Sequence, residues 1–358
     1  MRVVVGLACA GLVVGCLGAP PEASSQDAGL DEGECPDGWI RRARVELTPE
    51  TQGALEDAPV QIALGIDLVA GLDLAADLSD LRVRGADGEP LELELEASDD
   101  DLERVWVRIP VIDAGPSEIW IFGGNARATP DEVVDGVWDG FYRGVWHLDE
   151  GPDGVYEDAT PFLHHAYGPY DEELNDNGPL GSTVDLPGDQ YGLEVEGDQT
   201  TAFESAITVE AVVRSDLVTD AGDDRFPVYA PAVRLAVEQA AGGFEPTLLL
   251  ASKASGMSEY TSTIGPEEVG TDWHYLVGTF GPDQMARLYV DGRLAAEEDQ
   301  GFDELYPSQA VLYLGSFVDG QIDEVRVSNV ARSPDYVTLQ YQVVRGRLVT
   351  VGDPEPCP

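Results

Sequence analysis

The sequence feature that most restricts the fold is a strict alternation of apolar and polar residues in short segments. Between Leu91 and Glu96, leucine and glutamate alternate without a break, so a strand here would place the leucines on one face and the glutamates on the other. Similar β-like segments, bounded by glycine or proline, occupy residues 44–47, 60–64, 81–84, 105–109 and 118–122. Because they recur from residue 39 to about 128 with no long helical pattern, we predict an antiparallel sandwich.

A second β-rich region extends from about residue 137 to 352, a common length for one all-β domain. Residues 207–213 predict a strand, and residues 274–280 and 286–294, with the Asp291-Gly292 turn, predict a hairpin. The 40 glycines and 24 prolines suit many turns between short strands. The chain is therefore predicted to be all-β, with two antiparallel β-sandwich domains.

A short apolar segment at the start of the sequence ends in a cysteine. Residues 3–14 are too few to span a bilayer, so they predict the core of a signal peptide. Residues 12–16, Leu-Val-Val-Gly-Cys, resemble the lipobox of bacterial lipoproteins, which implies cleavage before Cys16 and a diacylglycerol on its sulfur. An ordinary secretory signal cleaved near Ala19 is the alternative. Leu17 after the cysteine resembles lipoproteins sent to the outer membrane, so we expect a lipid anchor there or at the cell surface.

The remaining cysteines predict a disulfide. Cys9 lies in the segment that cleavage would remove, and lipidation at Cys16 leaves Cys35 and Cys357. Two cysteines in an exported chain indicate one bridge, with two free thiols as the alternative. We expect a signal peptide at 1–15, a flexible tether at 16–37, a first sandwich at 38–135, a second at 136–353, and a tail at 354–358 that carries Cys357.

The first sandwich contains short motifs in a recognisable order. They are Trp39-Ile40-Arg41-Arg42, Pro59-Val60, Asp80-Leu81-Arg82-Val83, Val105 to Pro110, and Ile119 to Asn125. Together they resemble the bacterial family called domain of unknown function 2341 over about ninety residues. Val83 replaces the usual Phe, and Phe122-Gly123 lacks the second aromatic residue of the closing motif. Since the activity of that family is unknown, the resemblance implies no function for this domain.

The second sandwich contains three further blocks. They are Trp273-His274 with Gly278-Thr279-Phe280, Leu288-Tyr289-Val290-Asp291-Gly292, and Gly320 to Val327 followed by Ala331-Arg332-Ser333. These blocks resemble the laminin G-like family, which implies a concanavalin A-like jelly roll that binds carbohydrate or protein through loops at one rim. The resemblance also implies one structural calcium ion, held by Asp158 and Asp323 with Asp149 as a weaker third ligand. For Asp323, the alternatives are a capping role or a salt bridge with Arg326 or Arg287.

Aromatic residues and histidines have simpler interpretations. Trp146, Trp273 and Tyr289, like Trp39, Trp106 and Trp120, are expected in the cores. Tyr167, Tyr170 and Tyr191 lie in loop-like sequence and could stack on a sugar. The sequence has no His-x-x-x-His or Cys-x-x-Cys pair, so no zinc site is predicted, and the adjacent His164 and His165 indicate a surface turn.

Charge and missing motifs limit the possible functions. The chain has 68 acidic against 20 basic residues, a net charge of -48, which argues against nucleic-acid binding. It lacks the Glu-x-Asp-x-x-Glu strand of some glycan-cleaving enzymes of this fold, a Gly-x-Ser-x-Gly elbow, a phosphate loop and a dinucleotide fingerprint. We therefore expect no catalytic residues and a cell-surface binding or adhesion module for carbohydrate or a surface protein. A structural scaffold is the alternative, and a glycan-active enzyme is less favoured.

Overall fold

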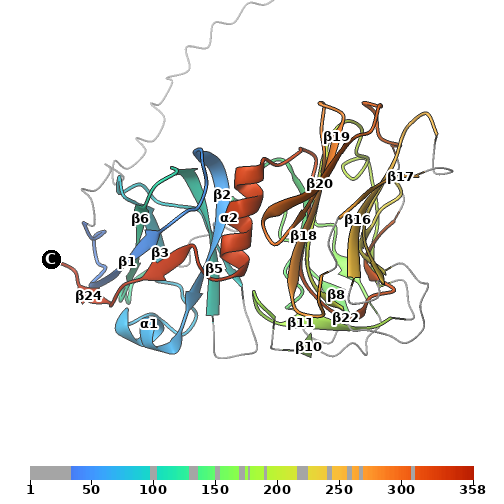
Figure 1. Cartoon of the computed structure of the whole chain (residues 1–358). Coiled ribbons are helices and arrows are strands. Elements are labelled where there is room, and N and C mark those ends of the chain that lie inside the picture. The colour runs from blue at the N-terminus through green and yellow to red at the C-terminus, as the bar shows by residue number, and fades with distance from the viewer. Residues whose placement is uncertain are drawn as a thin grey trace, which may run out of the picture.

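The computed structural model describes residues 34–96, 103–128, 136–149, 154–168, 174–175, 178–188, 192–215, 225–239, 244–255, 260–265, 269–307 and 311–358. The expected signal peptide, Cys16 and most of the expected tether lie outside these residues. Neither helix in the described part of the chain is long and apolar enough to cross a membrane. The described residues form two antiparallel β-sandwiches, as the alternating pattern predicted (Figure 1).

The first sandwich packs a five-stranded sheet against a three-stranded sheet. Sheet A has the strand order β23-β1-β6-β3, with β24 also paired with β1, and sheet B has the order β2-β5-β4. Their strands are β1 (Arg41–Leu47), β2 (Leu55–Leu64), β3 (Arg82–Gly85), β4 (Leu93–Glu96), β5 (Glu103–Ile112), β6 (Ser117–Gly123), β23 (Val349–Val351) and β24 (Glu355–Pro356). Alternate residues of β1 and β2 point into one shared core, and the short helix α1 (Ile66–Gly71) follows β2.

The second sandwich contains two eight-stranded sheets. Sheet C has the order β10-β11-β22-β13-β18-β19-β20, with β7 also paired with β22, and sheet D has the order β17-β16-β15-β14-β21-β12-β9-β8. Sheet C comprises β7 (Tyr142–Trp146), β10 (Leu174–Asn175), β11 (Thr183–Pro187), β13 (Ile207–Ser215), β18 (His274–Phe280), β19 (Met285–Val290), β20 (Arg293–Asp299) and β22 (Asp319–Ser328). Sheet D comprises β8 (Val155–Tyr156), β9 (Ala166–Tyr167), β12 (Leu193–Val195), β14 (Arg225–Tyr229), β15 (Val233–Gln239), β16 (Phe244–Ala251), β17 (Tyr260–Ile264) and β21 (Leu312–Ser316).

The predicted Asp-Gly turn is present, but it joins β19 to β20, so the predicted second strand of the hairpin is two strands. The predicted first strand, β18, pairs with β19 through another turn at residues 281–284. Val290 pairs with Arg293 across the turn formed by Asp291 and Gly292, which have φ angles of 50° and 77°. Both angles lie in the left-handed region that a tight hairpin turn requires and that Asp-Gly sequences favour. The side chain of Asp291 also accepts a hydrogen bond from the backbone of Tyr275, at 3.0 Å, which ties this turn to β18.

The C-terminal segment returns to the first sandwich, which differs from the expected domain boundary at residue 353. Strands β23 and β24 pair with β1, so residues 349–356 extend sheet A. Before them, helix α2 (Pro334–Val344) lies between the two sandwiches (Figure 1). The sequence analysis did not predict this helix, although Ser333 and Pro334 form a recognisable N-terminus in which the Ser333 hydroxyl accepts from the Tyr336 backbone.

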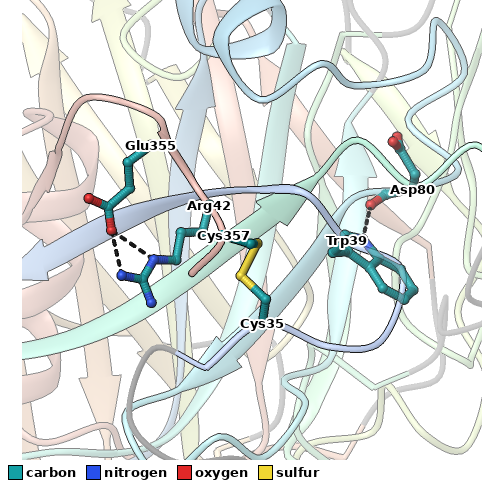
Figure 2. Close-up of a disulfide and its surroundings, with 6 residues drawn as sticks. All are labelled: Cys35, Trp39, Arg42, Asp80, Glu355 and Cys357. Carbon is teal, nitrogen blue, oxygen red and sulfur yellow. Dashed lines mark hydrogen bonds and ion pairs between the residues drawn. A yellow bond between two sulfur atoms is a disulfide. The ribbon is translucent and has the colours of Figure 1, made fainter.

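The disulfide between Cys35 and Cys357 is present, with the two Cα atoms 5.8 Å apart. Figure 2 shows it beside the ion pair of Arg42 with Glu355. On the other side of Cys35, the indole of Trp39 donates to the carbonyl of Asp80 at 2.7 Å (Figure 2). The bridge therefore joins the two ends of the described chain next to sheet A.

Strand β4 keeps the predicted alternation, with leucines on one face and glutamates on the other, but its glutamates are covered by protein. Leu93 is buried, but Leu95 is 40% exposed and Glu96 is only 5% exposed. The indole of Trp106 donates to Glu96, and the indole of Trp138 donates to Glu94, each at 2.6 Å. The glutamate face, which alternation alone would assign to solvent, therefore turns toward the second sandwich.

Candidate functional site

Asp158, a predicted calcium ligand, organises a loop. It lies between β8 and β9, and its carboxylate is buried. It accepts hydrogen bonds from the backbones of Val145, Thr160 and His164, at 3.0, 2.9 and 2.8 Å, and from the Thr160 hydroxyl at 2.8 Å. These four bonds use both oxygens and fix the course of residues 158–164.

Asp323 and Asp149, the other predicted calcium ligands, lie near the junction of the sandwiches. Asp323 is buried in β22 and accepts from the backbone of Leu180 at 3.0 Å, so it has neither of the salt bridges considered for it. Burial, and then the nearby Glu324, raise the pKa of Asp323 well above its ordinary value. Burial likewise raises the pKa of Asp149.

The structure does not gather the three aspartates into a metal site. Among the described residues, no group of three or more His, Cys, Asp or Glu side chains is placed to hold a metal ion. Calcium binding therefore stays a prediction, and the hydrogen bonds of Asp158 and Asp323 explain their burial without a cation.

The outer face of sheet C, which points away from the core of the second sandwich, carries buried charges. Arg326 donates through Nε to Glu324 and through Nη1 to Gln340 of α2, each at 2.6 Å, and Nη1 lies 4.0 Å from Glu210. Its guanidinium also lies 4.8 Å from the ring centre of Trp106 in the first sandwich. One arginine therefore contacts sheet C, α2 and sheet B. We call Glu210, Glu324, Arg326, Gln340 and His147 the interface network.

His147 joins the interface network from the segment after β7. Its Nδ1 lies 2.8 Å from a Glu324 oxygen, and its ring stacks on Trp106 with centres 5.5 Å apart. Burial opposes a charge on the imidazole, but Glu324, Glu94 and Glu96 outweigh it and raise the pKa of His147 well above its ordinary value. Burial would raise the pKa of Glu324, yet Arg326 and His147 lower it. These carboxylates neutralise buried cations and lie between two packed sheets, so a polymeric substrate has no access to them.

A hollow of about 390 Å³ opens at one end of the second sandwich. Its lining comes from four separate segments: β7, the loop before β9, the loop before β13, and the residue after β22. The lining residues are Arg143, Phe162, Gln199, Thr200, Ala202, Phe203, Glu204, Ser205, Ala206 and Asn329. We call it the rim pocket. It combines one exposed aromatic ring with hydroxyl, amide, carboxylate and guanidinium groups, which is the chemistry of a small polar ligand site.

The aromatic side of the rim pocket is held in place by cation and ring contacts. The Arg143 guanidinium lies 4.8 Å from the centre of the Phe162 ring, and His164 stacks parallel to that ring at 5.8 Å. Arg143 also donates to the carbonyls of Gly140 and Tyr142, each at 2.8 Å. The side chain of Asn329 lies between Arg143 and the carbonyl of Phe141. Phe162 lies within the loop that Asp158 organises, so a predicted metal ligand supports this pocket indirectly.

The loop before β13 contributes a tight polar turn to the rim pocket. Asp198 accepts from the backbone and the hydroxyl of Thr200, each at 2.6 Å, and its oxygen lies 3.4 Å from Nε2 of His164. These bonds, first those from Thr200, lower the pKa of Asp198 to about 2. The turn therefore holds a carboxylate beside the pocket that stays ionised at any physiological pH.

Several aromatic predictions are confirmed. Trp106, Trp146 and Tyr289 are buried, at 0%, 1% and 1% exposure. The other three predicted core tryptophans are half-buried, each beneath an arginine: Trp39 under Arg82, Trp120 under Arg42, and Trp273 under Arg214.

The three proposed sugar-stacking tyrosines separate into two groups. Tyr167 lies in β9 and is 49% exposed. Tyr170 and Tyr191 fall outside the described residues. The rim pocket itself was not predicted, because its lining comes from four segments far apart in the sequence. The one available signal was an aromatic residue, Phe162, directly after Pro161 in a loop.

Comparisons with known proteins agree with the jelly-roll prediction. Residues 187–338 match the family model Laminin_G_3, described as the concanavalin A-like lectin/glucanases superfamily. These residues therefore have the concanavalin A-like lectin fold that the sequence predicted for the second sandwich. No curated protein matches the chain. The lipoprotein signal and the resemblance of the first sandwich to domain of unknown function 2341 stay predictions.

Solved structures similar to this chain include toxin binding domains. The binding domain of Paraclostridial Mosquitocidal Protein 1 is 10% identical with a TM-score of 0.48, and the match covers 56% of this chain and 52% of that one. The Botulinum neurotoxin serotype D binding domain is 11% identical with a TM-score of 0.45, covering 56% of this chain and 50% of that one. This chain thus spans about half the length of either toxin domain. Domain 4 of AbnA, a GH43 extracellular arabinanase from Geobacillus stearothermophilus, solved with arabinotriose, is 16% identical with a TM-score of 0.43, covering 55% of this chain and 97% of that one.

Proposed function

We propose that this chain is an exported binding protein whose second sandwich binds carbohydrate at the rim pocket. The observation that carries the proposal is the composition of the pocket: an exposed aromatic ring, Phe162, lines a hollow of about 390 Å³ together with hydroxyl and amide groups. A sugar ring offers an apolar face of C–H groups and an edge of hydroxyls, so it complements such a surface. The lectin-type fold of residues 187–338 supports the same reading by analogy of fold.

The proposed activity is binding without catalysis. Glu210 and Glu324, two carboxylates of sheet C, are buried in the interface network and neutralise Arg326 and His147. An acid and base pair for glycan cleavage must reach the bond between two sugars. The alternative ligand is a surface protein of the cell envelope. If the chain binds no ligand at all, a scaffold role is favoured.

The carbohydrate proposal can be tested by titrating the full chain with neutral mono- and trisaccharides in a calorimeter. Phe162→Ala is expected to weaken binding about two- to tenfold, because one aromatic contact contributes about 0.5–1.5 kcal/mol. Leu163→Ala is the matched control, since Leu163 is the next residue, is 63% exposed and does not line the pocket. Equal losses in the two variants, or no binding by the unaltered chain, would contradict the proposal.

The proposed location is the cell envelope, with a lipid on Cys16 and a tether that holds the sandwiches away from the membrane. Labelling cells with a radioactive fatty acid should mark the full chain, and Cys16→Ser should remove the label and release the chain from membranes. A Cys16→Ser chain that stays labelled would exclude this anchor. Fractionation of the two membranes tests the expected outer-membrane location.

A structural calcium ion completes the proposal, with Asp158 as its first candidate ligand. If calcium binds only the folded chain, added calcium must raise the unfolding temperature, with a stabilisation that grows as the logarithm of one plus its concentration over Kd. Asp158→Asn keeps the size of the side chain and should abolish that rise, whereas magnesium should not replace calcium. An unchanged unfolding temperature at millimolar calcium would reject the ion.

A further inference from the structure

Seven neighbouring strands of sheet D each contribute one residue to a single row across the sheet. The pairing registers place Tyr167 beside Glu194, Glu194 beside Tyr313, and Tyr313 beside Tyr229. They continue the row from Tyr229 to Arg234, then to Leu249 and Ser262. We call these seven residues the tyrosine row. Six steps of about 4.8 Å between strands make the row about 29 Å long.

The tyrosine row lies on the outer face of sheet D. In six of the seven strands, all but β17, the residues next to the row point into the core, as Ala166 does beside Tyr167 and Leu312 and Leu314 do around Tyr313. Because side chains alternate along a strand, the row residues point to the opposite side. The core that joins the two sandwiches includes Val212 and Tyr275 of sheet C and no described residue of sheet D, so the first sandwich does not cover this face.

The centre of the tyrosine row is fixed before any ligand arrives. The guanidinium of Arg234 lies 4.4 Å from the Tyr229 ring centre and 4.0 Å from that of Tyr260. It donates to both phenol oxygens, at 3.0 and 2.8 Å, and the Tyr260 hydroxyl donates to the Pro231 carbonyl at 3.0 Å. Rings held in this way lose little entropy when a ligand contacts them.

The aromatic rings are spaced along the row and inclined to one another. Tyr229 and Tyr313 have ring centres 6.1 Å apart, with planes at 66°. Tyr167 lies two strands beyond Tyr313, with the exposed Glu194 between them. The row therefore offers two neighbouring aromatic rings, Tyr229 and Tyr313, with a third ring beyond the carboxylate of Glu194 and with the guanidinium of Arg234 on the other side of Tyr229.

We propose that the tyrosine row binds an extended chain of a neutral, soluble polysaccharide laid across the strands. This inference rests on the proposed carbohydrate function and adds a second, longer site to the rim pocket. Tyrosine rings contact the apolar faces of successive sugars, while Glu194 and Arg234 bond to their hydroxyls. A net charge of -48 repels acidic polysaccharides, which is why the occupant is neutral.

The twist of the sheet defines the physical state of the occupant. Neighbouring strands rotate by about 20–25°, so side chains along the row cannot lie in one plane. The 66° angle between the two central tyrosines shows the same departure from a flat platform. A single flexible glycan chain can follow this surface, whereas a flat crystalline surface would contact only part of it.

The test is affinity electrophoresis of the full chain through gels that contain soluble mixed-linkage glucan, xylan or galactomannan. For the polysaccharide that retards the unaltered chain, Tyr167→Ala should weaken the retardation about two- to tenfold. Tyr167→Phe, which keeps the ring, should leave the retardation unchanged. Leu294→Ala is the matched control, because Leu294 is as exposed as Tyr167, at 48% against 49%, and lies in β20 of sheet C. A hexasaccharide should bind more tightly than a trisaccharide, since it reaches more of the row.

The outcomes separate this inference from the proposed function. If Tyr167→Ala and Glu194→Ala are retarded like the unaltered chain while Phe162→Ala loses binding, the row is not a site and the rim pocket stands. If the row variants lose polysaccharide binding while Phe162→Ala has no effect on trisaccharides, the row stands and the rim pocket fails. Absence of binding to every glycan would overturn both.

Discussion

The two outer faces of the second sandwich follow the same alternation but serve different purposes. The outer face of sheet C lies against α2 and the first sandwich, and its charged residues in the interface network, Glu210, Glu324 and Arg326, are almost fully buried and paired. The outer face of sheet D carries the tyrosine row, whose members range from half-buried to exposed. Buried charges must be paired, because an unpaired buried charge is costly, and the pairs then hold the sandwiches together. An aromatic row that lies outside the shared core is instead open to a ligand.

The largest expected effect comes from removing Arg326, the buried cation on the outer face of sheet C. Arg326→Met leaves Glu324 and Glu210 buried without their main partner, so the free energy of unfolding should fall by about 3–5 kcal/mol. Denaturant unfolding measures this loss. Arg44→Met is the control, because Arg44 pairs with Glu118 at an exposed site, where a salt bridge contributes about 0–1 kcal/mol. Similar losses in both variants would remove the distinction between the two kinds of site.

The disulfide should have the next largest effect, since it fixes the segment that follows α2. Replacing both Cys35 and Cys357 with serine should lower the free energy of unfolding by about 2–4 kcal/mol. Without the bridge, β24 keeps its pairing with β1 at residues 41 and 42 but becomes the weakest part of sheet A. Hydrogen exchange should therefore detect opening first at the amide of residue 357, which bonds to the carbonyl of Ile40 at 3.0 Å, and only later in α2 and β23. Simultaneous opening of all three would show that the bridge holds α2 in place directly.

The buried junction of the two sandwiches, where Glu96 and His147 lie, should also make stability depend on pH. Burial raises the pKa of Glu96 to about 7, from 4.5, despite the nearby His147, while Asp149 and Glu324 add to the rise. The folded chain holds the Glu96 proton to a higher pH than the unfolded chain does. The stabilisation that this gives the folded chain is therefore complete below about pH 4.5 and is lost as the pH rises through about 7. The raised pKa of His147 acts in the same direction above its ordinary value of 6.5.

Glu96→Gln tests this dependence while keeping an acceptor for the indole of Trp106. The variant should match the unaltered chain near pH 5 and be more stable at pH 8, by at most about 3 kcal/mol for a shift of this size. Thermal unfolding from pH 5 to pH 8 measures the slope. Glu46→Gln, at an exposed position of β1, should leave the slope unchanged. A variant with the original slope would show that Glu96 stays ionised in the folded chain.

The sequence predicted strands well and faces less well, and strand β4 shows why. Alternation identified residues 91–96 as a strand, of which 93–96 form one. It could not tell that the glutamates face another domain, because a polar face looks the same whether water or a second sandwich covers it. The bulge in β22 at Glu324, where φ is 39°, is equally hidden in a single sequence, yet it helps bring Asp323, Glu324 and Arg326 to the interface.

The candidate sites depend on pairings that no local pattern encodes. Tyr229 and Tyr313 are neighbours because β14 pairs with β21, although 84 residues separate them in the sequence. The sequence identified Tyr167 as a sugar-stacking candidate because it is an aromatic residue in a loop-like segment. Its place in a row could be found only from the pairing registers of β9, β12 and β21. The calcium ligands, in contrast, came from family resemblance, and the structure gives two of them other hydrogen-bond partners.

The smallest expected effect completes the comparison between the faces. Tyr167→Ala should change the free energy of unfolding by no more than about 0.5 kcal/mol. Tyr167 is 49% exposed and lies at the end of the row, and among the described residues its side chain makes no hydrogen bond to a buried group. Chemical unfolding of the full chain measures it beside the glycan-binding assay. A loss of binding with unchanged stability assigns Tyr167 to recognition. A loss above about 1.5 kcal/mol would instead make Tyr167 a structural residue, and the outer face of sheet D would then resemble that of sheet C, where polar and aromatic side chains hold the fold together.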